Sequence, residues 1–79
     1  MSKANLFCVL ITRDSGDGWR THRCVAWLPG YLLTQGIQAA SEAYPDAGVE
    51  AFSAAEFAPG EEPGLGEEWV ERALEDSEL

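Results

Sequence analysis

The chain has 79 residues, 46% of them hydrophobic, and a formal net charge of −9 at pH 7. This length fits one domain with a small core, and its three Trp and three Phe residues argue against disorder over the whole chain. A charge of this size and sign argues against direct binding to nucleic acid or to an anionic membrane.

The charge is unevenly distributed along the chain. From Glu42 onward there are twelve carboxylates and one basic residue, a net charge of −11, whereas residues 1–41 have four basic and two acidic residues. An acidic segment of this kind attracts basic surfaces, including the grooves in which proteins hold DNA or RNA. We therefore expect a basic protein partner and no cofactor.

The first half of the chain predicts a β-hairpin. Residues 5–13 form an almost continuous apolar, β-prone run, residues 14–18 (DSGDG) are typical of a tight turn, and residues 19–27 alternate as a returning strand. A five-residue loop over 14–18 would place Cys8 opposite Cys24, Leu10 opposite His22 and Thr12 opposite Arg20. The apolar run is too short for a signal peptide or a membrane span, so we expect a cytoplasmic protein.

A helix is predicted next, over residues 29–44, with apolar residues at helical spacing and Pro45 as its terminator. Gly36 costs such a helix about 1 kcal/mol relative to Ala, which indicates close contact with the strands at that position. Residues 49–57 alternate as a short third strand, expected at an edge of the sheet.

The acidic end is predicted to form a second helix. Residues 58–66 are rich in Pro and Gly and predict a loop, and residues 67–76 place Trp69, Val70, Ala73 and Leu74 on one helical stripe. The expected fold is therefore α+β in a single domain over 1–79: a ββαβ core with an antiparallel sheet over 1–57, a loop over 58–66, and an acidic helix or tail over 67–79.

No pattern of catalytic or metal-binding residues stands out. His22 is the only histidine and shares a predicted strand face with Cys24, and Cys8 can join them, but no orienting acid or fourth ligand lies at a suitable spacing. Both cysteines lie in apolar runs, so we interpret them as buried core thiols and the protein as non-enzymatic.

Two groups of residues are candidates for partner binding. The first is the acidic segment, whose carboxylates would lie on overlapping helix faces and occupy a basic groove in place of nucleic acid. The second is the hairpin tip, with Trp19 and Arg20, supported by Arg23, as anchors. The candidate residues are Glu61, Glu62, Glu67, Glu68, Glu71, Glu75, Asp76, Trp19 and Arg20.

The chain resembles a class of small proteins from phages and mobile elements. A ββαβ unit with a glycine-containing hairpin tip, a helix ending in Tyr44-Pro45, a short third strand and an acidic end is similar to the anti-CRISPR proteins directed at type I surveillance complexes. The resemblance implies DNA mimicry or a block of the site that reads the protospacer-adjacent motif. The resemblance covers the whole chain only in outline, and it assigns no role to any particular residue.

Our leading hypothesis is therefore an inhibitor that binds a basic, nucleic-acid-binding surface of a CRISPR effector complex and prevents DNA engagement, either by occlusion or by locking a conformation. The alternative is a small structural or adaptor protein of a phage or mobile element. Such a protein would be a monomer or a homodimer formed through an open sheet edge, and its acidity would serve solubility alone.

Overall fold

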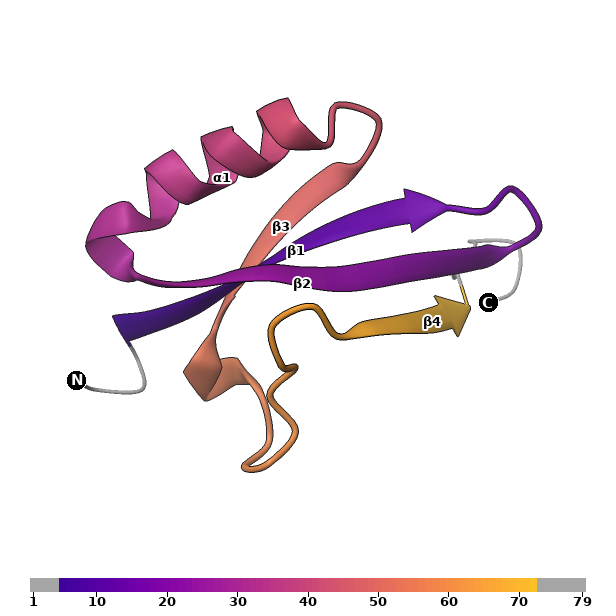
Figure 1. Cartoon of the computed structure of the whole chain (residues 1–79). Coiled ribbons are helices and arrows are strands. Elements are labelled where there is room, and N and C mark those ends of the chain that lie inside the picture. The colour runs from indigo at the N-terminus through magenta and orange to yellow at the C-terminus, as the bar shows by residue number, and fades with distance from the viewer. Residues whose placement is uncertain (1–4, 73–79) are drawn as a thin grey trace.

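The computed structural model describes residues 5–72, which form one antiparallel sheet with the strand order β3-β1-β2-β4. Helix α1 lies on one side of this sheet, and the connection between β3 and β4 lies on the other (Figure 1). The elements are β1 (Leu6–Asp14), β2 (Trp19–Pro29), the 3-10 helix η2 (Gly30–Leu32), α1 (Leu33–Ala43), β3 (Gly48–Ser53), the 3-10 helix η3 (Ala54–Glu56) and β4 (Glu68–Arg72).

The central hairpin of β1 and β2 is present, but its predicted register is wrong by two residues. Leu10 pairs with Cys24 and Thr12 with His22, because the five-residue loop begins at Ser15 rather than at Asp14. Asp14 instead pairs with Arg20, and the backbone N–H of Ser15 donates to the Trp19 carbonyl at 3.0 Å. Between Leu10 and Asp14 the shift is even, so the side chains there keep their predicted faces.

A bulge interrupts this hairpin in its middle. Val9 pairs with Ala26 and the next residue, Leu10, with Cys24, so Val25 has no partner on β1. Bulges increase the local twist of a strand pair. Because of the bulge, Cys8 is opposite Trp27 rather than Cys24. The sulfur atoms of Cys8 and Cys24 nevertheless lie 3.3 Å apart.

The predicted helix is confirmed in place and in termination. It begins with the short η2 turn and continues as α1 to Ala43, one residue before Tyr44 and two before Pro45. The close contact expected at Gly36 is also present: a Cβ atom there would lie 2.1 Å from Leu28 Cδ1 on β2. Helix α1 and the sheet are therefore in close contact at Gly36 and Leu28, where there is no room for an additional methyl group.

The third strand is an edge strand, as predicted, but it is shorter than expected. β3 ends at Ser53 because a capping box begins there: the Ser53 side chain accepts from the Ala55 N–H, and Glu56 accepts from the Ser53 N–H at 2.7 Å. Reciprocal bonds of this kind favour the start of a helical turn over a continued strand.

The predicted acidic helix over 67–76 is wrong. Residues Glu68–Arg72 form strand β4, which pairs with the free edge of β2, while residues 73–79 lie outside the described part of the chain. The segment has a period of two as well as a helical stripe: Trp69 and Glu71 lie on one face, opposite His22 and Arg20. Stacking of Trp69 on the buried His22 ring, with centroids 5.5 Å apart, favours the strand.

The core lies on both faces of β1. Val9 and Ile11 are almost completely buried on the helix side, and Ala40 of α1 is buried with them. On the opposite face, Cys8, Leu10 and Cys24 form a buried cluster. The partly buried side chains that pack against this second cluster are Trp27, Phe52, Phe57 and Trp69. We call this side, opposite α1, the open face.

The contact at Gly36 gives a test of the helix packing. We expect Gly36→Ala to lower the free energy of unfolding by about 1 kcal/mol, because the displaced Leu28 side chain costs more than the helix propensity gained. In a Leu28→Ala background, where the clash is absent, Gly36→Ala should raise the free energy of unfolding by about 1 kcal/mol, because only the gain in helix propensity remains. Urea denaturation of the four proteins measures the cycle, and equal effects in both backgrounds would show that Leu28 does not limit the approach.

Candidate partner-binding face

The open face is built around a buried histidine. His22 is 7% exposed, its Nδ1 lies 3.0 Å from the Thr12 hydroxyl, and its ring stacks on Trp69. Its Nε2 lies 3.3 Å from a carboxylate oxygen of Glu71, but that pair is not aligned as a hydrogen bond, and Nε2 has no hydrogen-bond partner among residues 5–72. A buried polar atom without a hydrogen bond is costly, so this position stands out in so small a protein.

A hollow of about 410 Å³ adjoins this histidine. Leu10 and His22 line its base, and three aromatic side chains line its sides from three separate elements of the chain. Three exposed carboxylates, which come from β3, η3 and β4, complete it. We call this the acidic hollow, defined by Phe52, Phe57, Trp69, Glu50, Glu56 and Glu71.

The aromatic side chains of the acidic hollow hold one another in place. Phe57 packs edge-on against Phe52, with ring centroids 6.2 Å apart, and also edge-on against Trp27 at 6.4 Å. The Trp27 indole N–H donates to the Pro63 carbonyl at 2.9 Å, which fixes the β3–β4 connection to the sheet. These contacts position Phe57 over the sulfur-containing core cluster.

A second hollow continues from the first along the β3–β4 connection. The two share Glu56, Phe57 and Trp69, and the second adds Glu61 and Glu67. Glu67 is held in place, because one of its carboxylate oxygens accepts from the Gly64 N–H at 3.0 Å. Carboxylates that are far apart in the sequence are therefore gathered around the single ring of Trp69.

The structure separates the predicted acidic residues from one another. Glu61, Glu67 and Glu71 lie around Trp69, whereas Glu62 lines a separate hollow beside Trp27. Glu68 is on the helix side of β4 and forms an ion pair with Arg23 at 3.4 Å. Glu75 and Asp76 lie outside the described residues.

Sequence reasoning missed Glu50, Glu56, Phe52 and Phe57 as members of a site. A signal for two of them was present, because Glu50 and Phe52 are two residues apart on a strand and so share a face. No local signal indicated that η3 and β4 would come to the same place, since that depends on the crossing of the sheet by residues 54–67.

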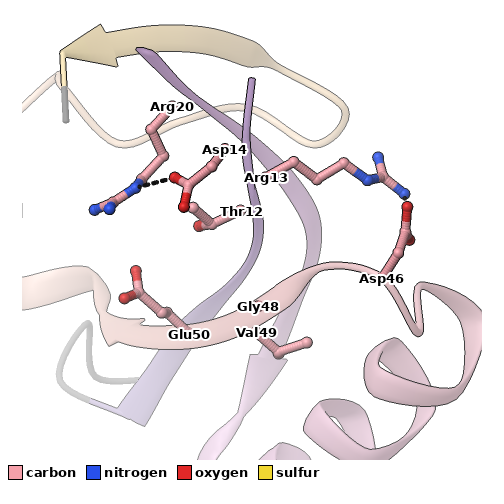
Figure 2. A pocket seen from close by; sticks show the side chains of 8 residues that line it. All are labelled: Thr12, Arg13, Asp14, Arg20, Asp46, Gly48, Val49 and Glu50. Carbon is pink, nitrogen blue, oxygen red and sulfur yellow. Dashed lines mark hydrogen bonds and ion pairs between the residues drawn. The ribbon is translucent and has the colours of Figure 1, made fainter. Parts of the chain in front are cut away.

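The arginines of the first half are engaged with carboxylates. Figure 2 shows the Arg20 guanidinium beside Asp14, at 2.8 Å, and the Arg13 guanidinium directed to the opposite side of the strand, where it reaches Asp46 at 3.2 Å. Asp14 raises the pKa of Arg20, and the nearby negative charges of Glu50 and Glu71 raise it further. The hydrogen bond from Arg13 holds the pKa of Asp46 below its usual range.

These ion pairs affect the hairpin-tip candidate. Trp19 is 46% exposed, as expected of a contact residue. Arg20 and Arg23, however, have carboxylate partners within the chain, so a partner would have to compete with Asp14 and Glu68 for them. The tip therefore offers one exposed ring and little available positive charge.

The two cysteines are free and completely buried. Burial raises the pKa of the Cys8 thiol, and the hydrogen bond and charge of Cys24 raise it further, so the reactive thiolate is disfavoured. Within residues 5–72 no three His, Cys, Asp or Glu side chains are grouped so as to hold a metal ion. The same part of the chain has no helix long and apolar enough to cross a membrane.

Comparison of the chain with protein-family models, with curated proteins and with solved structures finds no match.

Burial of the thiols gives a second test. We expect native Cys8 and Cys24 to react with a disulfide reagent about 10³-fold more slowly than in the urea-unfolded chain, because reaction requires opening of a core worth several kcal/mol. A Ser41→Cys variant, which adds an exposed thiol on α1, should gain one fast-reacting group. Fast reaction of the wild-type thiols would show that the core cluster opens readily.

Proposed function

We propose that the protein is a non-enzymatic inhibitor that binds a basic, nucleic-acid-binding surface of another protein and prevents DNA engagement. The observation that carries this proposal is the imbalance on the open face. Glu50, Glu56 and Glu71 gather there from three elements, the described residues that line the hollow include no arginine or lysine, and Arg20, whose pKa Glu50 and Glu71 raise, has Asp14 as its partner. Such a face is complementary to surfaces that bind phosphate groups.

The binding element in this proposal is a folded sheet face rather than an acidic helix. Strands β3 and β4 and the connection between them supply the carboxylates, and hydrogen bonds hold two of them, Glu56 and Glu67, in position. Preorganised charges lose less conformational entropy on binding than a flexible acidic tail would. The mechanism is occlusion, in which the carboxylates occupy the positions of phosphates, and it requires no chemical step.

The target class follows from the resemblance of the chain to anti-CRISPR proteins. Among nucleic-acid-binding assemblies, a type I CRISPR surveillance complex is the one we propose as partner, in the cytoplasm of a bacterium. The groove or pocket that reads duplex DNA in such a complex must be basic, because phosphate contacts dominate affinity for DNA. An acidic protein of 79 residues is small enough to fill part of such a groove.

A second candidate function is an adaptor that self-associates through a sheet edge. β4 is an edge strand with only five residues, and its Val70 side chain is 60% exposed. Exposed edge strands pair readily with other strands. A dimer in solution whose binding to other proteins does not depend on salt would favour this alternative.

Charge reversal on the open face tests the leading proposal. We expect Glu50→Lys and Glu61→Lys each to weaken binding to a purified type I surveillance complex about fivefold or more, because each replaces an attraction with a repulsion. Glu42→Lys makes the same charge change on helix α1 and should leave the affinity within twofold. Biolayer interferometry at several salt concentrations, with thermal melts of each variant, provides the measurement. Failure of the wild-type protein to bind the complex, or to displace its target DNA, would refute the proposal.

The hairpin-tip version makes a different prediction in the same assay. If the open face is the interface, Trp19→Ala should change the affinity by less than twofold, because the Trp19 ring contributes nothing to the acidic hollow. A loss of tenfold or more for Trp19→Ala, with the glutamate variants unaffected, would move the interface to the tip.

A further inference from the structure

The acidic hollow combines aromatic walls with a rim of carboxylates. Its sides are aromatic, with Phe52, Phe57 and Trp69, and its carboxylates come from three separate elements. An aromatic ring attracts a cation to its face, and a carboxylate attracts the same cation by charge. The chemistry of the lining therefore selects a positively charged group attached to an apolar or flat stem.

His22 gives an independent indication of a ligand. The ring is more than nine-tenths buried and lines the base of the hollow, yet its Nε2 has no hydrogen-bond partner among residues 5–72. Glu71 lies 3.3 Å from this nitrogen without forming a hydrogen bond. A donor group entering the hollow can bond to the exposed Glu71 carboxylate, which lies beside this buried nitrogen without a hydrogen bond to it.

The described residues that line the hollow include three carboxylates and no arginine or lysine. Arg20 lies close enough for Glu50 and Glu71 to raise its pKa, and it is hydrogen-bonded to Asp14 at 2.8 Å. Glu50, Glu56 and Glu71 therefore have no cationic side chain beside them in the described lining of the hollow. A bound cation would remove mutual repulsion among these carboxylates as well as gain their attraction.

The geometry favours a guanidinium over an ammonium group. A guanidinium is planar, stacks on aromatic rings and has five N–H donors, so it can bond to several carboxylates that approach from different sides. An ammonium is a compact point charge that is more strongly hydrated. The volume of about 410 Å³ is within the range of small-ligand pockets and accommodates one long side chain.

We propose that the acidic hollow is a binding pocket for an arginine side chain presented by the basic surface of a partner protein. This inference rests on the proposed function, because the basic surface of the proposed partner supplies the arginine. The bound arginine would be the central anchor of that interface. The arginine would lie beside Trp69 and Phe57 with its guanidinium among the three glutamates. Arginine residues seated in aromatic pockets are typical centres of binding energy in protein interfaces.

The pocket can be tested without any partner protein. The probe is N-acetyl-arginine amide, titrated into the 15N-labelled full chain, with N-acetyl-citrulline amide as a neutral control of the same shape and N-acetyl-lysine amide as a second cation. We expect the Trp69 indole N–H signal to shift with arginine at a dissociation constant on the order of 1 mM. The lysine probe should bind at least about threefold more weakly, and the citrulline probe should cause no saturable shift.

Conservative variants locate the binding. Glu50→Gln and Glu71→Gln keep the shape of the hollow and should each weaken arginine binding about threefold or more, whereas Glu42→Gln on α1 should leave it unchanged. Trp69→Phe should weaken it while preserving an aromatic ring in the strand. Equal shifts with arginine and citrulline, or shifts confined to the neighbouring hollow at Arg13 and Asp46 that Figure 2 displays, would overturn the proposal.

The experiments distinguish an error in the arginine pocket from an error in the proposed function. If the arginine probe binds but the wild-type protein does not bind a surveillance complex, the pocket stands and the assigned partner is wrong. If a Glu50→Gln/Glu71→Gln double variant no longer binds the probe yet binds the complex with unchanged affinity, the role of the pocket as the anchor is overturned, while the inhibitor function stands.

Discussion

The crossing of the sheet by residues 54–67 is the constraint on which the rest of this structure depends. β1 and β2 form the central pair, so β3 and β4 lie on opposite edges and their connection must pass over the open face. Three bonds fix this connection: the Gly66 N–H donates to the Cys24 carbonyl at 2.8 Å, the Cys24 N–H to the Glu67 carbonyl at 3.0 Å, and the Trp27 indole to Pro63. They bring Phe57 over the core cluster and start the pairing of β4.

The same crossing explains why carboxylates accumulate in one place. The chain from Glu42 onward is acidic throughout, and its elements β3, η3 and β4 each place one carboxylate at the same part of the open face. The three arginines of β1 and β2 form ion pairs with other carboxylates: Arg13 with Asp46, Arg20 with Asp14 and Arg23 with Glu68. The fold thus pairs Arg13, Arg20 and Arg23 with carboxylates along the hairpin, and other carboxylates gather around Trp69.

A face with excess charge costs stability, and aromatic packing offsets that cost here. Phe52, Phe57, Trp27 and Trp69 all pack against a core of only three buried residues, so the open face is apolar beneath its acidic rim. Electrostatic repulsion among exposed carboxylates is modest in water, whereas the burial of aromatic surface is worth several kcal/mol. The charge can therefore serve recognition without preventing folding.

The sequence by itself determined the elements whose cause is local. The hairpin turn follows from Gly16 and Gly18, which alternate with Asp14 and Asp17, and α1 follows from its apolar spacing and Pro45. The burial of the two cysteines follows from their apolar neighbours. Only the tertiary structure decided the conformation of residues 68–72, where a helical stripe and a strand alternation compete and the free edge of β2, with His22 ready to stack on Trp69, selects the strand. The acidic hollow belongs to this second group, because it is formed by long-range crossing of the sheet, which local sequence periodicity does not encode.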